Sequence, residues 1–279
     1  MQSIGHGFRA VAKALAEWDG TIGELVSRLD RQRVPFLSFS KLSTVEFCEH
    51  RYLLEYVEGV QLDEEPAYFS KGNTFHAAAS MAYQQMNEGN TDIEMLLTRV
   101  REHRPKDHHA HLSNAVTLMV QNAHRGYTLV ATEHPFVLSL GRGLPPLVGV
   151  IDLLLRKGQT FLAVDHKTGK NFYHQDKLQL LLYGEYVRRA FKPKRCLACY
   201  DEYRWVNNLD RIRKPAFRRT HVRSSPRSWP VVLRRIKNGF DAICRITKTG
   251  RADSGTQCYM CPFKDSCERA VVTEWGSWW

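Results

Sequence analysis

The 279-residue sequence contains no run of about 18 apolar residues, the length that a transmembrane helix requires. Its first residues, MQSIGHGFRAVAKALAEWDG, carry charge throughout and lack the continuous apolar segment of an export signal. Internal repeats and low-complexity segments are also absent. These absences predict a cytoplasmic protein, intracellular and not secreted, that has no membrane contact.

Acidic residues are scarce relative to basic ones. There are 29 Asp and Glu against 40 Lys and Arg, which leaves a formal net charge of +11. Such a charge indicates an acidic partner such as nucleic acid, although a solvated basic face kept for solubility is an alternative. The seven cysteines of a protein in a reducing compartment indicate metal ligands or buried thiols rather than disulfides.

The first half of the chain has the apolar spacing of helices. The residues before Pro35 predict a helical N-terminal extension, interrupted near Asp19-Gly20. The next helix begins near Ser40, a good N-cap residue, and its apolar stripe directs Cys48 inward. The helices predicted in this half cover residues 8–30, 40–56, 67–87, 92–104 and 113–132.

From Pro135 onward the pattern becomes that of strands, followed by alternating helices and strands. This order predicts an α/β (mixed α+β) domain with a small central mixed sheet flanked by helices and a helical N-terminal part. The predicted strands cover residues 135–140, 147–156, 160–167 and 195–206, and the predicted helices cover 174–190 and 228–247.

The segment LVGVIDLLLRKGQTFLAVDHK predicts a β-hairpin. If Gly158-Gln159 is a two-residue type II′ turn, with glycine supplying the positive φ, Lys157 pairs with Thr160. The same register places Asp152 directly opposite Asp165. Opposed like charges on one face of a sheet are destabilising unless something neutralises them. A divalent cation is one such neutraliser. The alternative is that both aspartates lie at frayed strand ends and bind loop backbone.

The two-residue period of a strand then sorts the neighbours of Asp165. Lys167 lies on the same face as Asp165, whereas His166 points to the other face. Carboxylates bind Mg²⁺ and Mn²⁺, and a bound cation can hold a phosphate oxygen and activate water. A nearby lysine can orient that water. The hairpin therefore predicts a site for phosphate chemistry.

Four short motifs in fixed order carry a family resemblance. They are Gly72-x-x-x-His76, Gly149-x-x-Asp152, Asp165-x-Lys167 followed by Thr168-Gly169, and Gln179-x-x-x-Tyr183. Together they resemble the PD-(D/E)XK nuclease superfamily, in particular its RecB-like exonuclease group. The resemblance implies a restriction-endonuclease-like core. It also implies that Mg²⁺ or Mn²⁺ is bound by His76, Asp152, Asp165 and the backbone carbonyl of His166.

The resemblance assigns roles to the remaining motif residues. Lys167 positions and helps to activate the attacking water. Gln179 and Tyr183 lie four residues apart and therefore on one helix face, where they hold Lys167 or the DNA backbone. Lys170, just beyond the motif, is a further DNA-binding candidate. Without their neighbours, His76 would be interpreted as a core histidine and the Gln-Tyr pair as a helix surface contact.

Four cysteines extend the resemblance. Cys258-x-x-Cys261, Cys267 and the distant Cys48 are similar to the split iron-sulfur motif of the AddB nuclease domain and of the CRISPR-associated adaptation exonuclease. The resemblance implies a [4Fe-4S] cluster that joins the ends of the domain. Four thiolates suit zinc equally well, so the spacing alone does not choose the metal, and free thiols are a third alternative.

The remaining cysteines and the basic segment have simpler interpretations. Cys196 and Cys199 fall on opposite faces of a predicted strand, so we expect them, and Cys244, to be buried small side chains. Residues 204–229 mix arginines with aromatics, a composition suited to phosphates and unpaired bases. The tail with Trp275, Trp278 and Trp279 could stack on bases, bind a partner or cover the protein's own core.

The sequence therefore predicts a metal-dependent DNA exonuclease that hydrolyses phosphodiester bonds of single-stranded DNA or DNA ends. Alternatives are a non-cutting DNA-binding module that serves a helicase or integrase partner, and a site-specific endonuclease of the same fold. DNA repair, phage replication and CRISPR adaptation are all compatible with these motifs. The predicted parts are a helical extension (1–36), the nuclease domain (37–270) and the Trp-rich tail (271–279).

Overall fold

The structure is a computed structural model of the chain. It describes residues 11–15, 22–31, 34–62, 67–90, 92–102, 104, 106–141, 143–172, 176–205 and 214–270. The chain divides into two compact units. The first comprises residues 1–66, 137–149 and 230–279, and the second comprises residues 67–136 and 150–229. The predicted Trp-rich tail lies outside the described residues.

One five-stranded sheet with the order β1-β2-β3-β4-β5 forms the centre of the fold. Its neighbours β2 and β3 are antiparallel, β3 and β4 are parallel, and β4 and β5 are antiparallel. The sheet is mixed, which confirms the predicted fold class. The strands are β1 (Thr128–Leu138), β2 (Leu147–Lys157), β3 (Thr160–Gly169), β4 (Arg195–Arg204) and β5 (Ala216–Arg223).

The β2–β3 hairpin has the predicted register. Lys157 pairs with Thr160, and the pairing continues to Leu153 and Val164. Gly158 has a φ of 58°, the left-handed conformation that the turn requires and that glycine adopts without steric cost. Asp152 and Asp165 are the next residues beyond these pairs, one on each strand.

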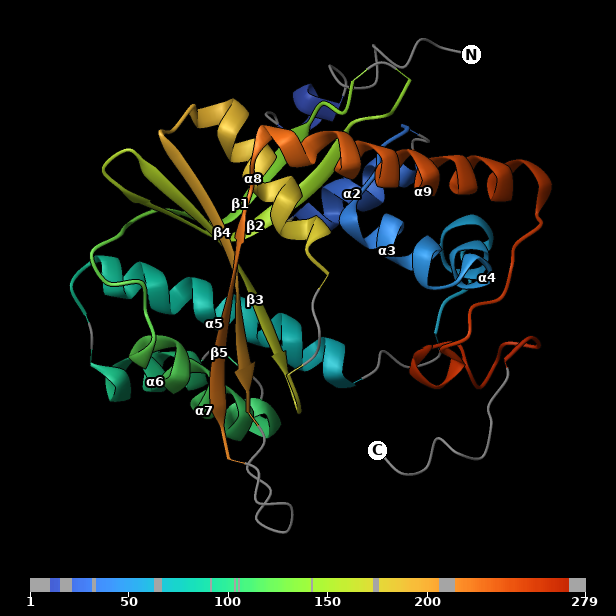
Figure 1. The fold of residues 1–279 in the computed structure, drawn as a ribbon. Coiled ribbons are helices and arrows are strands. Elements are labelled where there is room, and N and C mark those ends of the chain that lie inside the picture. The colour runs from blue at the N-terminus through green and yellow to red at the C-terminus, as the bar shows by residue number, and fades with distance from the viewer. Residues whose placement is uncertain are drawn as a thin grey trace. The chain divides into compact units, whose positions relative to one another are not determined.

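Helices cover both faces of the sheet in the second unit (Figure 1). α5 (Ala67–Asn87), α6 (Ile93–Glu102) and α7 (His109–Gln121) share a core with alternate residues of β2, β3 and β4. α8 (Leu178–Phe191) connects β3 to β4 and packs on the opposite face. Buried side chains of the core include Phe75, Leu96, Val116, Met119, Leu153, Val164 and Tyr203.

The first unit contains α2 (Ile22–Arg31), α3 (Phe39–Phe47), α4 (Glu49–Tyr52), the π-helix η1 (Leu53–Glu58) and most of α9 (Trp229–Thr249). A small core of Val11, Leu25, Leu29, Phe36 and Val148 lies within it. Two short 3₁₀ segments, η2 (Lys106–His108) in the second unit and η5 (Cys258–Met260) in the first, complete the described elements that bear on the sites below. No helix among the described residues is long and apolar enough to span a membrane.

The predicted helix from Ser40 is wrong in two respects. Its N-cap is Ser38, whose side chain accepts a hydrogen bond from the Lys41 backbone N–H at 3.1 Å. It also ends at Phe47, because Cys48 adopts an extended conformation (φ −164°, ψ 117°) and starts α4 as its N-cap. Cys48 therefore does not lie on a continuous helical stripe.

Two further predictions are corrected in the second unit. The helix predicted over residues 113–132 ends at Gln121, and residues from Thr128 belong to β1. Strand β5 was not predicted at all, because its sequence AFRRTHVR places adjacent arginines where alternation between apolar and polar residues is expected.

Candidate active site

Four of the motif residues form a closed ring of polar contacts on the α8 side of β3. Lys167 Nζ lies 2.7 Å from Asp165 Oδ2 and donates a hydrogen bond to Gln179 Oε1 at 3.1 Å. Gln179 Nε2 donates to the Tyr183 hydroxyl at 2.9 Å, and that hydroxyl donates to Asp165 Oδ1 at 3.1 Å. Lys167 is held directly by Asp165 and Gln179, and Tyr183 restrains both of these residues.

The Asp152 carboxylate connects the two strands of the hairpin. Its Oδ2 accepts a hydrogen bond from the His166 backbone N–H at 2.7 Å. The same oxygen lies 3.4 Å from Nδ1 of His76, which projects from α5. The structure thus brings His76, Asp152 and Asp165 to one place from three separate elements, as the motif order predicts.

Glu133 is a further member of this group and was not predicted from the sequence. Its Oε1 lies 3.9 Å from His76 Nδ1, and ligand atoms of Glu133, His76 and Asp152 all lie within 4.8 Å of one another. Glu133 has a φ of 47° within β1. Left-handed backbone is uncommon for a residue other than glycine and is concentrated at functional sites. We refer to His76, Glu133, Asp152, Asp165 and Lys167 as the carboxylate centre.

The carboxylate centre has the donor set of a site for a hard cation. Three carboxylates and an imidazole lie together, and oxygen ligands of this kind suit Mg²⁺ and Mn²⁺. Asp165 Oδ2 is buried and lies 2.7 Å from the Lys167 ammonium. A single ammonium does not balance three clustered carboxylates, and unbalanced charge is costly to bury, so the residues present fit a divalent cation.

Comparisons with known proteins identify the family of the chain. The family model of the PD-(D/E)XK nuclease superfamily matches residues 36–268. The chain belongs to this superfamily. A structure named "Putative exonuclease", from Eubacterium rectale, shares 11% sequence identity with a TM-score of 0.53, and the match covers 88% of this chain and 92% of that one. This likeness supports the shared fold.

A second structure, named SSO0001, matches with 11% identity over 74% of this chain and 97% of its own. Its TM-score of 0.35 is too low to indicate a common fold. No curated protein sequence matches the chain significantly.

Burial dominates the electrostatics of the acidic residues in this PD-(D/E)XK nuclease. The pKa of Asp152 is raised to about 7, chiefly by removal from water and also by the Asp165 and Glu133 carboxylates, whereas His76 and Lys167 act in the opposite direction. Burial also raises the pKa of Glu133. Without a cation, the centre is therefore partly protonated near neutral pH.

The pKa of Lys167 is also raised, but for a lysine this favours the charged form, whereas for Asp152 and Glu133 it favours the neutral form. Burial acts to lower the pKa of Lys167, but the negative charges of Asp165 and Asp152 outweigh burial and raise the pKa above its ordinary value. Lys167 consequently remains an ammonium ion. It can donate hydrogen bonds and stabilise negative charge, but it is unsuited to removing a proton from water.

The side chain of His166 lies on the other face of the sheet, as the strand period predicts. It is buried against Tyr203, whose hydroxyl lies 3.3 Å from Nδ1, and against Phe75. Burial lowers the pKa of His166 to about 3, so the ring is neutral at physiological pH. The backbone N–H of His166 binds Asp152 of the carboxylate centre, whereas its ring only lies near the His76 ring, with the centroids 6.4 Å apart.

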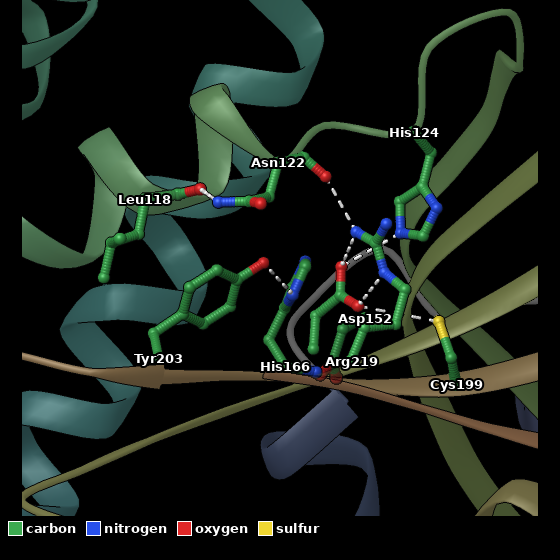
Figure 2. Close-up of polar contacts among 9 residues, drawn as sticks. Leu118, Asn122, His124, Asp152, His166, Cys199, Tyr203 and Arg219 are labelled. Carbon is green, nitrogen blue, oxygen red and sulfur yellow. Dashed lines mark hydrogen bonds and ion pairs between the residues drawn. The ribbon is translucent and has the colours of Figure 1, made fainter. Parts of the chain in front are cut away.

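A second polar cluster lies beside the His166 ring (Figure 2). Arg219 donates two hydrogen bonds to the buried carboxylate of Asp201, at 2.6 and 2.8 Å, and a third to the Asn122 carbonyl at 2.7 Å. His124 Nε2 lies 2.9 Å from Asp201, and the Cys199 thiol lies 3.7 Å from it. His124, Cys199 and Asp201 have the residue types of a metal site, but the Arg219 guanidinium already neutralises the carboxylate. This cluster therefore holds β4 and β5 together.

This cluster corrects the interpretation of the basic segment. The Arg218 and Arg219 guanidinium groups lie against Glu202 and Asp201 of β4, in the register of the β4–β5 pair. The positive charge of these arginines is largely balanced by the sheet and is not wholly available to phosphates. Residues 206–213 of the same segment lie outside the described residues.

Four cysteines of the first unit line one pocket. The cysteine pocket is formed by Cys48, Cys258, Cys261 and Cys267, with Arg51 and Lys264 among its other lining residues. Cys48 Sγ accepts hydrogen bonds from the backbone N–H groups of Arg51 (3.4 Å) and Gly255 (3.2 Å). Burial raises the pKa of the Cys261 thiol.

Gly255 allows the close approach that this pocket requires. A Cβ atom at residue 255 would lie 2.4 Å from the Phe47 carbonyl oxygen and 3.0 Å from Cys48 Cβ, so a larger residue would displace Cys48.

The other cysteines are separate from the cysteine pocket. Cys199 is buried, and Cys196 lies on the opposite face of β4, 3.5 Å from the Gly184 carbonyl. The expectation that Cys244 is buried is wrong, because it is exposed on α9. Lys170, the remaining predicted DNA-binding residue, is exposed just beyond the end of β3.

Proposed function

We propose that this chain is a divalent-metal-dependent DNA exonuclease that hydrolyses phosphodiester bonds of single-stranded DNA or DNA ends. The observation that carries the proposal is the convergence of Asp152 and Asp165 beside an ammonium group, Lys167, in a member of the PD-(D/E)XK nuclease superfamily. Carboxylates and a lysine in this arrangement suit the negatively charged transition state of phosphodiester hydrolysis once a cation is bound.

The metal ligands of the proposed nuclease are His76, Asp152 and Asp165, with the His166 carbonyl as a further candidate. Mg²⁺ or Mn²⁺ held there would supply Lewis-acid stabilisation and a water of lowered pKa. The His166 N–H orients Asp152, and the Tyr183 hydroxyl orients Asp165. Glu133 lies close enough to His76 to bind the cation itself or through a water.

Lys167 has two tasks in this proposal. Its ammonium group donates a hydrogen bond that orients the attacking water, and it stabilises the charge that develops on the phosphate. Gln179 and Tyr183 hold it in place, because Gln179 accepts from Lys167 and donates to Tyr183. Since the raised pKa keeps Lys167 charged, the proton of the water is transferred to another group, for which the Glu133 carboxylate beside His76 is a candidate.

A structural [4Fe-4S] cluster in the cysteine pocket completes the proposal. The four cysteines line one pocket, and four thiolates suit either zinc or an iron-sulfur cluster. The similarity to the split iron-sulfur motif favours the cluster. Because Cys48 is distant in sequence from the other three, the cluster would close a long loop and stabilise the first unit.

The decisive experiment uses two DNA substrates. Purified protein is incubated with end-labelled linear single-stranded DNA and with closed circular single-stranded DNA, each with Mg²⁺, Mn²⁺ or a chelator. We expect metal-dependent degradation of the linear substrate alone. Cutting of the circle would support an endonuclease of the same fold, and binding without cutting of either substrate would support a non-cutting module.

The cluster has an independent readout. A brown protein that absorbs at about 400 nm and contains iron supports the [4Fe-4S] assignment. A colourless protein with one equivalent of zinc contradicts it. The boundaries at residues 36 and 270, and a helicase or integrase partner, remain predictions from the sequence.

A further inference from the structure

Two guanidinium groups lie over one aromatic ring at the end of β3. Phe172 follows this strand by three residues, and the ring centroid is 5.2 Å from Cζ of Arg204 and 4.8 Å from Cζ of Arg218. Cations over an aromatic face are attracted by its quadrupole. Arg204 is the last residue of β4, and Arg218 belongs to β5. Three separate elements therefore meet at this ring.

The sheet register connects this group to the carboxylate centre. Lys167 pairs with Glu202, and Glu202 pairs with Arg218. Paired residues point to the same face, so Arg218 lies on the face that carries Lys167, at a lateral distance of about 10 Å for two strand spacings. Because β3 and β4 are parallel, their carboxyl ends lie at the same end of the sheet (Figure 1). Ligands of open α/β sheets bind beyond the carboxyl ends of such strands.

The charge of this group is positive. Glu202 accepts two hydrogen bonds from Arg218, both at 2.6 Å, and balances one of the two guanidinium groups. Arg204 donates from Nε to the Lys214 carbonyl at 3.0 Å, and within the described part of the chain no carboxylate forms an ion pair with it. Lys170 is exposed in the same stretch. The surface beside the carboxylate centre therefore favours an anion.

We propose that Arg204, Phe172 and Arg218 form a subsite for the nucleotide next to the phosphodiester bond that is cut. Arg204 holds its phosphate, and the aromatic ring, with the Glu202-paired Arg218 packed against it, provides the surface on which an unpaired base stacks. The planar guanidinium group suits both contacts, since it can bind phosphate through two N–H groups and can stack on flat rings. This subsite rests on the proposed nuclease function and accounts for a preference for single-stranded DNA.

The test compares variants at the two ends of β4. Arg204→Ala removes the charge at the edge near Lys167, and Arg195→Ala removes an exposed arginine at the opposite end of the same strand. We expect Arg204→Ala to raise KM for a single-stranded oligonucleotide about tenfold with kcat within about twofold of wild type. Affinity for DNA falls with salt, and the magnitude of the slope of log affinity against log salt concentration should become smaller by about 0.7, the value for one phosphate contact to a single strand. Arg195→Ala should change neither quantity.

A second variant separates stacking from charge. Phe172→Leu keeps an apolar side chain but removes the aromatic ring, so it should raise KM about 5- to 100-fold and leave the salt slope unchanged. Arg204→Lys keeps the positive charge that Arg204→Ala removes, so it should have the same salt dependence as wild type. Thermal unfolding of each variant checks that the fold is intact.

The outcomes distinguish the subsite from the nuclease function. If wild type cuts DNA while Arg204→Ala and Phe172→Leu both keep the wild-type KM, the subsite is wrong and the nuclease assignment stands. If wild type does not cut DNA with either metal, the nuclease function itself fails. An equal effect of Arg195→Ala and Arg204→Ala would also contradict the subsite, because Arg204 would then contribute no more than any other positive charge on the surface.

Discussion

The carboxylate centre and the cysteine pocket are both expected to hold metal, but they are built differently. Members of the carboxylate centre come from α5 and from strands β1, β2 and β3, and hydrogen bonds among Asp165, Lys167, Gln179 and Tyr183 hold its geometry. Three of the four cysteines instead lie in residues 251–270, whose only helical element is the short turn η5. Cys48 Sγ accepts a hydrogen bond from the Gly255 backbone N–H, and the Cys258 thiol donates to the Gly255 carbonyl.

This difference separates a metal used for chemistry from a metal used for structure. The carboxylate centre is organised by its own side chains, so removal of its cation should stop catalysis and leave the fold intact. The cysteine pocket has few such restraints, so removal of its cluster should unfold the segment around it. The following predictions test this contrast, from the largest expected effect to the smallest.

Substitution of Asp165 should have the largest effect on activity. Asp165→Asn keeps the shape of the side chain and its ability to accept from Tyr183, but removes one negative charge from the centre. We expect kcat to fall at least about 1000-fold, measured with end-labelled DNA at saturating Mn²⁺. The thermal unfolding midpoint should remain within a few degrees of wild type. A variant that keeps more than a tenth of wild-type activity would exclude Asp165 as a metal ligand.

Substitution of Cys258 should have the largest effect on stability. Cys258→Ser removes one of four thiolate ligands, so the protein should lose iron and become less stable by several kcal/mol, an order-of-magnitude expectation for a structural metal. Hydrogen exchange should locate the loss of protection in residues 250–270, while β3 keeps its protection. The control is Cys244→Ser, which changes an exposed cysteine outside the pocket. Equal iron content in both variants would contradict the assignment of the cysteine pocket.

Substitution of Glu133 should have an intermediate effect, on affinity for the metal. Glu133→Gln removes a carboxylate that lies beside His76, and we expect affinity for Mn²⁺ to fall about 10- to 100-fold, in the range found when groups that support a metal site are removed. Calorimetric titration with Mn²⁺ measures it. Glu102→Gln, an exposed residue at the end of α6, is the matched control. If both variants bind Mn²⁺ as wild type does, Glu133 has no part in the centre.

The pH dependence of metal binding should show a smaller, graded effect. Because burial raises the pKa of Asp152 to about 7, a proton occupies this carboxyl below that pH, and a cation has to displace it. Affinity for Mn²⁺ should fall about tenfold for each pH unit below 7 and level off above it. The same raised pKa stabilises the metal-free fold at low pH, and that stabilisation is lost as the pH rises through 7. Titrations between about pH 5.5 and 8.5 measure the trend, and Asp152→Asn should abolish it.

Much of the carboxylate centre could be predicted from the sequence because its geometry is local. The Gly158-Gln159 turn sets the hairpin register, and the register sets the positions of Asp152 and Asp165. The two-residue period separates Lys167 from the His166 side chain. The four-residue spacing of Gln179 and Tyr183 places them in hydrogen-bond contact on one helix face.

The parts that could not be predicted depend on distant partners or on unusual backbone. Glu133 was missed because the apolar residues after 113 continue a helical period past the point where β1 begins, and because a positive φ at glutamate has no sequence signature. β5 was missed because Arg218 and Arg219 are acceptable in a strand only when Glu202 and Asp201 lie opposite them. That pairing is set by tertiary structure.

The central claim is that Lys167, held by Asp165 and Gln179, serves DNA hydrolysis at the carboxylate centre. The most direct measurement is the rate at which wild type and Lys167→Ala degrade end-labelled single-stranded DNA with Mn²⁺. We predict that wild type degrades the DNA, that the variant is at least about 1000-fold slower, and that both bind the DNA with similar affinity. Equal rates for the two proteins would contradict the claim.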